Sequence, residues 1–184
     1  QLFELFRCGF SATVTSSAFD NCRTGAYAVT SPPFGPCSGF RPCEPGFYCT
    51  NEMRYSCPAG TYGATESLSN SSCSGTCQAG YWCPPESTSS TSRKCGNVTV
   101  YCPAGSSIPL AVPAGYYSVS SDGSDMLDLG LVHDEHDEDL RSGVVECPQG
   151  WYCPGQNDAA GQASGRRVHC PGGTFRTSVG ATSA

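Results

Sequence analysis

Large apolar side chains occur in short clusters along this chain, and the clearest clusters hold two adjacent aromatic residues. The pattern Cys-x-x-Gly-aromatic-aromatic-Cys occurs at Cys43–Cys49, Cys77–Cys83 and Cys147–Cys153. The starts of these segments lie 34 and 70 residues apart, and midway through the longer gap Val112–Ser118 keeps the pattern with both cysteines replaced. The apolar positions therefore predict a repeat of about 35 residues.

A second signature, Cys-x-x-Gly followed by a small residue and an aromatic, falls between these segments. It occurs at Cys22–Tyr27, Cys57–Tyr62 and Cys170–Phe175, with a weaker copy at Cys102–Gly105. We expect each glycine to permit a tight chain reversal, and the aromatic pair to cover the neighbouring disulfide. The spacings divide the chain into a divergent first unit, two cysteine-rich units, one unit without cysteine and an incomplete last unit: 1–42, 43–76, 77–111, 112–146 and 147–184.

Composition decides what holds such units together. Leu, Ile, Val and Phe account for 28 of the 184 residues, too few for burial alone to offset the entropy lost on ordering the chain. The 22 glycines and 14 prolines favour turns and short extended pieces over long helices. We therefore predict small disulfide-rich repeats with short β-hairpins and little other regular secondary structure, stacked as an elongated rod.

The predicted cross-links leave their pairing open. Sequence alone does not say which cysteine bonds to which. The cysteines expected to be oxidised are Cys8, Cys22, Cys37, Cys43, Cys49, Cys57, Cys73, Cys77, Cys83, Cys95, Cys102, Cys147, Cys153 and Cys170.

From about residue 37 onward, these motifs resemble the ephrin-receptor-like cysteine-rich repeats, which are related to growth-factor and tumour-necrosis-factor-receptor modules. The segment from Cys95 to Tyr117 is similar to tandem arrays in surface proteins of algae and related protists, some of which belong to flagellar hairs and other extracellular fibres. The resemblance implies a structural array or an adhesive ectodomain, and it implies no catalytic residues.

Other features point to the outside of the cell. Asn70 and Asn97 each begin an N-glycosylation sequon, and we expect both to carry glycans. The net charge of −6 with a single lysine, Lys94, disfavours a nucleic-acid partner. No apolar stretch approaches the length of a membrane span. We expect a secreted or cell-surface protein, with no membrane span in this chain.

Unit 112–146 departs most from the repeat. Eight of the sixteen acidic residues lie between Asp122 and Asp139, around the apolar run Met126–Val132. This unit has neither a cysteine nor enough apolar area to order itself, so we expect it to be either a solvated loop or a strand that pairs with another chain.

The same unit holds the candidates for metal binding. Asp122, Asp125 and Asp128 could bind calcium loosely, and no other cofactor is expected. His133 and His136 would face together on a helix, but their surroundings favour a solvated acidic face. Zinc is disfavoured because the chain lacks repeated close ligand pairs such as a second copy of the Cys73 and Cys77 spacing. No nucleophile or phosphate-loop motif indicates an enzyme.

Two functions remain open at this point. The leading hypothesis is a structural extracellular protein, a protomer or segment of a glycosylated fibre that assembles head to tail. The alternative is a cysteine-rich stalk or binding module of a cell-surface receptor or adhesin. The apolar residues Leu2, Phe3, Leu5 and Phe6, together with 147–184, are the predicted contacts between subunits. By the spacing of earlier units, Cys170 would find its partner near position 185, in a longer chain or in a neighbouring copy.

Overall fold

The fold is a succession of two-stranded antiparallel hairpins. The computed structural model describes residues 25–30, 37–120, 140–155, 165–175 and 177–183. Within these ranges there are seven hairpins and no helix, and each strand pairs only with its own partner. The prediction of a small disulfide-rich fold built from short hairpins is confirmed.

The first four hairpins lie within residues 26–94. Their strands are β1 (Ala26–Thr30) with β2 (Cys37–Pro42), β3 (Phe47–Thr50) with β4 (Met53–Ser56), β5 (Thr61–Tyr62) with β6 (Gly75–Thr76), and β7 (Tyr81–Trp82) with β8 (Arg93–Lys94).

The remaining three hairpins lie within residues 100–169. Their strands are β9 (Val100–Tyr101) with β10 (Leu110–Ala111), β11 (Tyr116–Ser120) with β12 (Arg141–Glu146), and β13 (Trp151–Tyr152) with β14 (Val168–His169).

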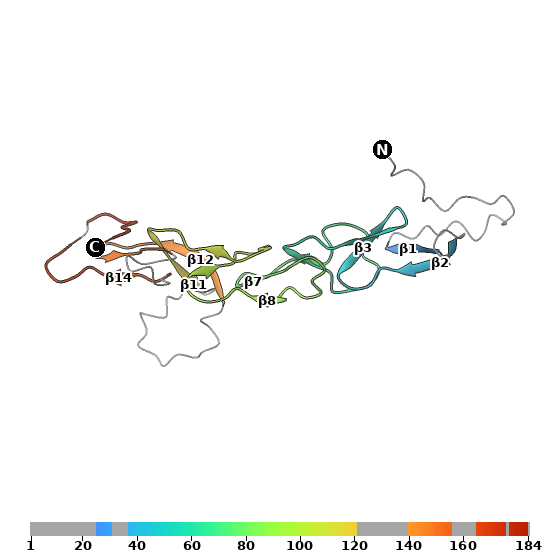
Figure 1. The fold of residues 1–184 in the computed structure, drawn as a ribbon, viewed down its shortest axis with the longest axis horizontal. Helices are drawn as coiled ribbons and strands as arrows, with labels where there is room; N and C mark the ends of the chain where they lie inside the picture. The colour runs from blue at the N-terminus through green and yellow to red at the C-terminus, as the bar shows by residue number, and fades with distance from the viewer. Residues whose placement is uncertain (1–24, 31–36, 121–139, 156–164, 176, 184) are drawn as a thin grey trace.

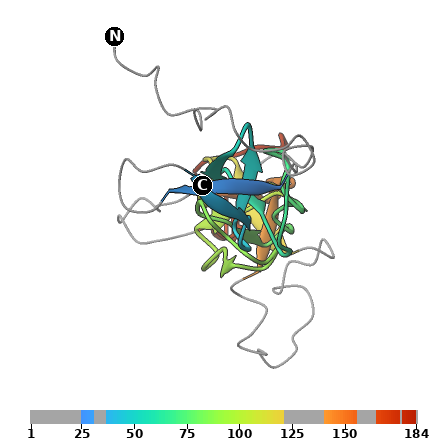
Figure 2. The ribbon, with the colours of Figure 1, turned by 90° about the vertical axis from the view of Figure 1, so that its right-hand side faces the viewer.

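The hairpins follow one another along the long axis of Figure 1, from β1 and β2 at one end to β14 at the other. In Figure 2, seen from the β1–β2 end, they lie one behind another. This order in space is the order in sequence, as expected for a repeat protein whose units contact their neighbours.

The structural repeat is a single hairpin, which is shorter than the predicted repeat. Range 43–76 holds the β3–β4 and β5–β6 hairpins, and range 77–111 holds β7–β8 and β9–β10. Range 112–146 holds the β11–β12 hairpin alone. The period of about 35 arises because two short hairpins together, or one hairpin with a long loop, occupy a similar length of sequence.

The buried core consists largely of half-cystines. The side chains that are fully buried are those of Cys43, Cys49, Cys57, Cys77, Cys83, Cys102, Cys147 and Cys153. Within the described residues, an apolar cluster forms where Tyr117 and Val119 meet the Cys147–Cys153 disulfide and Trp151 packs against the group. Buried half-cystines therefore take the place of the missing aliphatic side chains in the interior of the hairpins.

Candidate functional site

Most described hairpins open with a tight turn that explains their glycine, whereas the β9–β10 hairpin has Thr99 at that position. In the first complete example, the amide of Phe47 donates to the carbonyl oxygen of Glu44 at 3.1 Å, and Gly46 at the third position has a φ of 87°. A turn of this kind requires a positive φ at its third residue, which glycine adopts without strain. Turns with the same bond and a glycine of φ between 81° and 88° recur at Gly60, Gly80, Gly105, Gly115, Gly150 and Gly173.

The joint between consecutive hairpins is made by backbone hydrogen bonds. We call the first residue of the turn the opening residue, and the residue six positions later the ring residue. For the β3–β4 hairpin these are Cys43 and Cys49, and they hold Ser67–Leu68, a loop dipeptide from the following hairpin. Ser67 donates to the carbonyl of Cys43 at 2.9 Å, and Cys49 donates to that of Leu68 at 2.8 Å. The joint therefore needs no particular side chain.

The same joint recurs along the chain, with hydrogen bonds of 2.8–3.2 Å. The loop dipeptides, each with the opening and ring residues that hold it, are Glu86–Ser87 with Cys57 and Gly63, Gly105–Ser106 with Cys77 and Cys83, and Gly180–Ala181 with Cys147 and Cys153. The first residue of each dipeptide is left-handed, and two of these are not glycine, since Ser67 and Glu86 have φ values of 62° and 66°. The geometry of the joint thus outweighs the backbone preference of the residue.

The turn glycine also makes room for the hairpin two places further on. A Cβ on Gly46 would lie 2.6 Å from the carbonyl oxygen of Glu86, and one on Gly115 would lie 2.9 Å from that of Gly180. We call this space the glycine seat. Other occupied seats pair Gly25 with Ser67, Gly60 with Gly105 and Gly80 with Leu140. Each hairpin with an occupied seat is therefore held by its next and its next-but-one neighbour.

The disulfides reinforce individual hairpins and do not connect distant ones. Three of them join an opening residue to a ring residue: Cys43–Cys49, Cys77–Cys83 and Cys147–Cys153. Cys57 instead bonds to Cys73, because its ring residue is Gly63, and Cys95 bonds to Cys102. These five bonds supply the pairing that the sequence left open, and they indicate an oxidising environment.

The expected disulfide at Cys170 does not form within the chain, because its thiol is free. Its ring residue is Arg176, so the short bond of the Cys43–Cys49 kind has no second sulfur. Cys8 and Cys22 lie outside the described residues, as does the side chain of Cys37.

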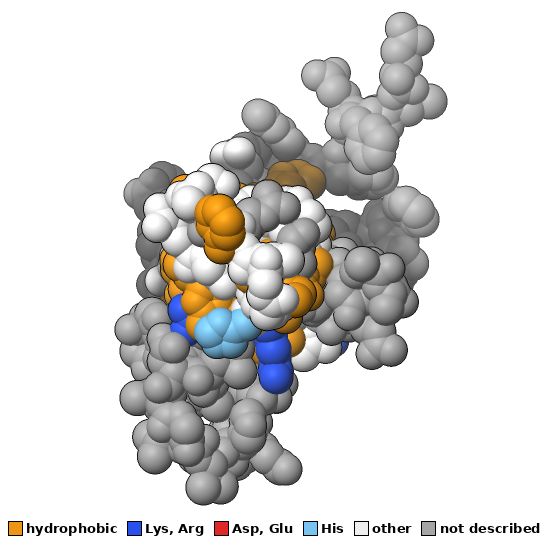
Figure 3. All heavy atoms as spheres, turned by 90° about the vertical axis from the view of Figure 1, so that its left-hand side faces the viewer, with side chains coloured by type: hydrophobic (Ala, Val, Ile, Leu, Met, Phe, Trp, Pro, Cys, Tyr) orange, Lys and Arg blue, Asp and Glu red, His pale blue; other side chains and the backbone are white. Residues whose placement is uncertain are grey.

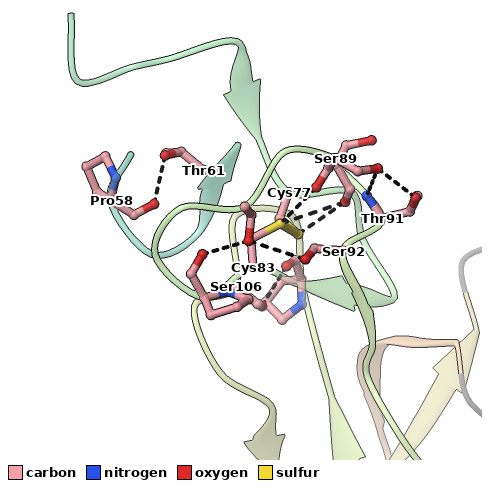
Figure 4. The surroundings of a disulfide bond; sticks show 12 residues. Pro58, Thr61, Cys77, Cys83, Ser89, Thr91, Ser92 and Ser106 are labelled. Atoms are coloured by element: carbon pink, nitrogen blue, oxygen red, sulfur yellow. Dashed lines mark hydrogen bonds between the residues drawn. A yellow bond between two sulfur atoms is a disulfide. The ribbon is translucent and has the colours of Figure 1, made fainter. Parts of the chain in front are cut away.

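Figure 4 shows how a loop closes over the Cys77–Cys83 disulfide. The carbonyl oxygen of Ser90 lies 3.1 Å from the sulfur of Cys77, and that of Ser89 lies 3.5 Å from the sulfur of Cys83. The hydroxyl of Ser87 donates to the carbonyl of Pro84 at 2.6 Å. The serine-rich loop therefore bonds to its own backbone around the disulfide, which accounts for its composition without a ligand.

The hairpin without cysteines keeps the joint and replaces the cross-link. Val112 and Ser118 take the opening and ring positions, and each is 2% exposed. The amide of Ser118 donates to Gly165 at 3.0 Å, as a ring cysteine would, and its hydroxyl donates to the carbonyl of Val98 at 2.7 Å. The expectation that unit 112–146 lacks the apolar surface to order itself is wrong for 112–120 and 140–146, where Tyr117 and Val119 are buried.

The aromatic residues pack mainly across their own hairpins. Tyr48 stacks on its cross-strand partner Tyr55 at 5.4 Å between ring centroids, and Trp151 stacks on His169 at 3.4 Å. Trp151 also contacts the Cys147–Cys153 cluster, so the expected covering of a disulfide is seen there. At Tyr48 the cross-strand contact replaces it, since paired strands bring these rings into direct contact.

A small polar network links the first two hairpins. Glu44 accepts a hydrogen bond from the Tyr27 hydroxyl at 2.9 Å and contacts the Arg54 guanidinium at 3.3 Å. That guanidinium also lies 4.3 Å from the centre of the Phe47 ring. A backbone hydrogen bond, followed by the bond from Tyr27, holds the pKa of Glu44 below its ordinary value of 4.5. The carboxyl is exposed, so the network makes a small contribution to stability.

Both predicted glycosylation sites lie on exposed asparagines. The side-chain oxygen of Asn70 accepts the amide of Ser72 at 3.0 Å. That of Asn97 accepts both the amide and the hydroxyl of Thr99, at 3.0 and 2.6 Å. Each sequon therefore forms a compact turn at the surface.

Several predicted sites fall outside the described residues. They are the calcium candidates Asp122, Asp125 and Asp128, the histidines His133 and His136, the apolar run Met126–Val132, and the interface residues Leu2, Phe3, Leu5 and Phe6. Within the described ranges, no group of three His, Cys, Asp or Glu side chains is placed to hold a metal ion. No helix there is long and apolar enough to cross a membrane.

The C-terminal end of the stack differs from its interior. A Cβ on Gly150 or Gly173 would meet nothing within 4 Å, although both glycines have the usual turn geometry. Phe175 is 83% exposed, whereas Tyr62 and Tyr152 at the equivalent position of their own turns are partly buried. Figure 3 views this end, where apolar side chains lie among backbone and uncharged polar side chains, with basic and histidine side chains at one edge. We call Gly150, Gly173 and Phe175 the C-terminal end face.

The geometry of the repeat is thus defined by its own backbone joints. No protein family matches this chain, and no curated protein does.

Proposed function

We propose that this chain is a structural protein of the extracellular space, a protomer or segment of a fibre whose length is made by stacked hairpins. The proposal rests on the backbone joint, which recurs between hairpins with hydrogen bonds of 2.8–3.2 Å. A joint that uses the same bonds at every step adds units in a constant manner, which suits a rod or spacer.

The way the side chains are used supports the same role. Nine of the thirteen buried hydrophobic residues in the described ranges are half-cystines, and the serine-rich loop over Cys77–Cys83 bonds to its own backbone. Glu44 and Arg54 pair with each other on the surface. An enzyme would instead gather reactive groups in a hollow. We therefore assign no catalytic residue.

The five disulfides and the two exposed sequons favour secretion. We propose that Asn70 and Asn97 carry glycans on the outer surface of the fibre. Digestion of the native protein with an N-glycan-removing enzyme should lower its mass and convert both asparagines to aspartate.

Immunogold labelling tests the structural role. An antibody raised against 43–111 should mark filaments in native extracellular material at regular intervals. Label at isolated points on membranes, with filaments unmarked, would contradict the fibre and favour a receptor stalk.

A further inference from the structure

We infer that folding closes the Asn97 sequon to N-glycosylation, whereas the Asn70 sequon stays open in the folded chain. This order of events rests on the proposed glycosylation of both asparagines and adds when each glycan is transferred. The glycan on Asn97 must be attached before the chain folds around that sequon. A molecule that folds first lacks this glycan, although its sequence is the same.

The transfer reaction needs access to two side chains of a sequon. The asparagine Nδ2 atom forms a bond to C1 of an oligosaccharide carried on a polyprenyl diphosphate, while the bond from C1 to the diphosphate oxygen breaks and Nδ2 loses a proton. The third residue must be serine or threonine, so the transferase has to recognise its hydroxyl group. A folded sequon is therefore a substrate only where both the asparagine and this hydroxyl can be reached.

The two sequons hold their asparagines alike but differ at the third residue. Asn70 and Asn97 are both exposed, and each Oδ1 atom accepts the amide of the third residue at 3.0 Å. A glycan attached to either asparagine is thus compatible with the folded structure. Ser72 is exposed, whereas Thr99 is only 9% exposed, and its hydroxyl donates to Asn97 at 2.6 Å. Only the second sequon has its hydroxyl buried.

Two segments from later in the chain cover the backbone beside Thr99. We call Ser118 and Gly165 the sequon clasp. The hydroxyl of Ser118 donates to the carbonyl of Val98 at 2.7 Å, and a Cβ on Gly165 would collide with the same carbonyl. The amide of Ser118 also donates to Gly165 at 3.0 Å, which ties the two parts of the clasp together. The same contacts that join the β11–β12 hairpin to the stack therefore close the sequon.

Both parts of the clasp follow the sequon in the chain. Ser118 lies 20 residues after Val98, and Gly165 lies a further 47 residues on. During synthesis the sequon therefore emerges first and stays open until both segments have been made. At a synthesis rate of about 5–20 residues per second, this interval lasts about 3–13 s. Transfer to Asn97 belongs to this interval and ends when the clasp forms.

A cell-free transfer assay on the full 184-residue chain, prepared without glycans, tests this order. The oxidised, folded chain and the reduced, alkylated chain are each incubated with purified oligosaccharyltransferase and a polyprenyl-diphosphate oligosaccharide, and mass spectrometry measures the rate at each asparagine. Ser71→Val with Ser72→Thr gives both sequons the sequence Asn-Val-Thr, so that only their surroundings differ. We expect similar rates in the reduced chain. In the folded chain, the rate at Asn97 should be lower by about tenfold or more, because transfer there requires local opening.

Two glycine variants separate the clasp from other effects of folding. Gly165→Ala forces the clasp apart, so the rate at Asn97 in the folded variant should rise about tenfold, toward that at Asn70. Gly172→Ala is the matched control. Neither glycine has a positive φ, and a Cβ on Gly172 would meet nothing within 4 Å, so this variant should leave both rates unchanged.

Equal rates at the two matched sequons of the folded chain would overturn the inference, as would an Asn97 rate that Gly165→Ala does not raise. The reduced chain judges the proposed glycosylation separately. If neither asparagine accepts the oligosaccharide there, the glycans themselves are rejected, and their order with them.

Discussion

The β7–β8 and β11–β12 hairpins stabilise the same turn and joint in two different ways. In the first, the Cys77–Cys83 disulfide links the opening residue to the ring residue. In the second, Val112 and Ser118 occupy those positions, and burial of Tyr117 and Val119 and a hydroxyl bond to Val98 replace the cross-link. Both keep the glycine turn, the occupied seat and the ring amide bonded to the next hairpin. The backbone joint is therefore the constant part of the repeat, and the disulfide is one of two ways to support it.

The largest expected effect comes from filling the glycine seat, because that breaks the part common to both hairpin types. Gly46→Ala and Gly115→Ala should each lower the free energy of unfolding by about 3–5 kcal/mol. Gly173→Ala is matched to them, since all three positions have φ of 87° or 88°, but its seat is empty. It should cost only about 1–2 kcal/mol for the left-handed backbone. Denaturant unfolding of the oxidised proteins measures the difference, and equal losses at all three positions would show that the seat contributes nothing.

An exchange of cross-links gives the next largest effect. Replacing Cys77 and Cys83 by serine should cost about 2 kcal/mol, at the lower end of the range for a disulfide because the ring is short. Val112→Cys with Ser118→Cys should form the missing bond, with a smaller net gain because the Ser118 hydroxyl bond to Val98 is lost. Peptide mapping should find the 112–118 disulfide, and Val112→Cys alone is the control. Failure of the new disulfide to form would mean that the two hairpins do not share one backbone geometry.

The smallest effect is expected at the surface network of Tyr27, Glu44 and Arg54. This network involves exposed charges and none of the backbone hydrogen bonds of the joint. Because folding lowers the pKa of Glu44, its ionised carboxyl stabilises the fold above pH 4.5, and this contribution is lost as the pH falls through the folded-state pKa. Glu44→Gln should therefore slightly reduce thermal stability at neutral pH and reduce the loss on acidification. Glu66→Gln, at another exposed carboxyl, should do neither. Identical pH profiles for all three proteins would assign no role to the network.

The hairpin class could be predicted from the sequence because its cause is compositional. Few aliphatic residues and many cysteines and glycines leave short stapled turns as the stable choice, and the motif at Cys43–Cys49 marks one of them directly. The size of the unit was harder to find, because Gly63 stands at a ring position where a cysteine would have revealed the second hairpin. Cys102–Gly105 marks the same kind of turn, since the amide of Ser106 donates to Pro103 at 3.2 Å and Gly105 has a φ of 81°, but this turn supplies a loop dipeptide and opens no hairpin.

The joint itself could not be predicted from residue types. Its bonds run between backbone groups, and its left-handed positions accept Ser67 and Glu86 as readily as Gly105 and Gly180. The joint leaves one trace in the sequence, the turn glycine, and the sequence pattern by itself predicts only a chain reversal there. The glycine must also leave space for the backbone of the hairpin two places further along the chain. This requirement is visible only in the folded structure.

The small disulfide rings also set how the chain would respond to pulling. A bond such as Cys43–Cys49 spans six residues, so it hides only about 20 Å of contour length from an applied force. Because the disulfides lie within single hairpins, none of the five carries tension from one joint to the next. A stretched array would yield one joint at a time, with each opened hairpin that carries a disulfide remaining tied by it. Such a material would extend in small steps and retain the register it needs to recoil.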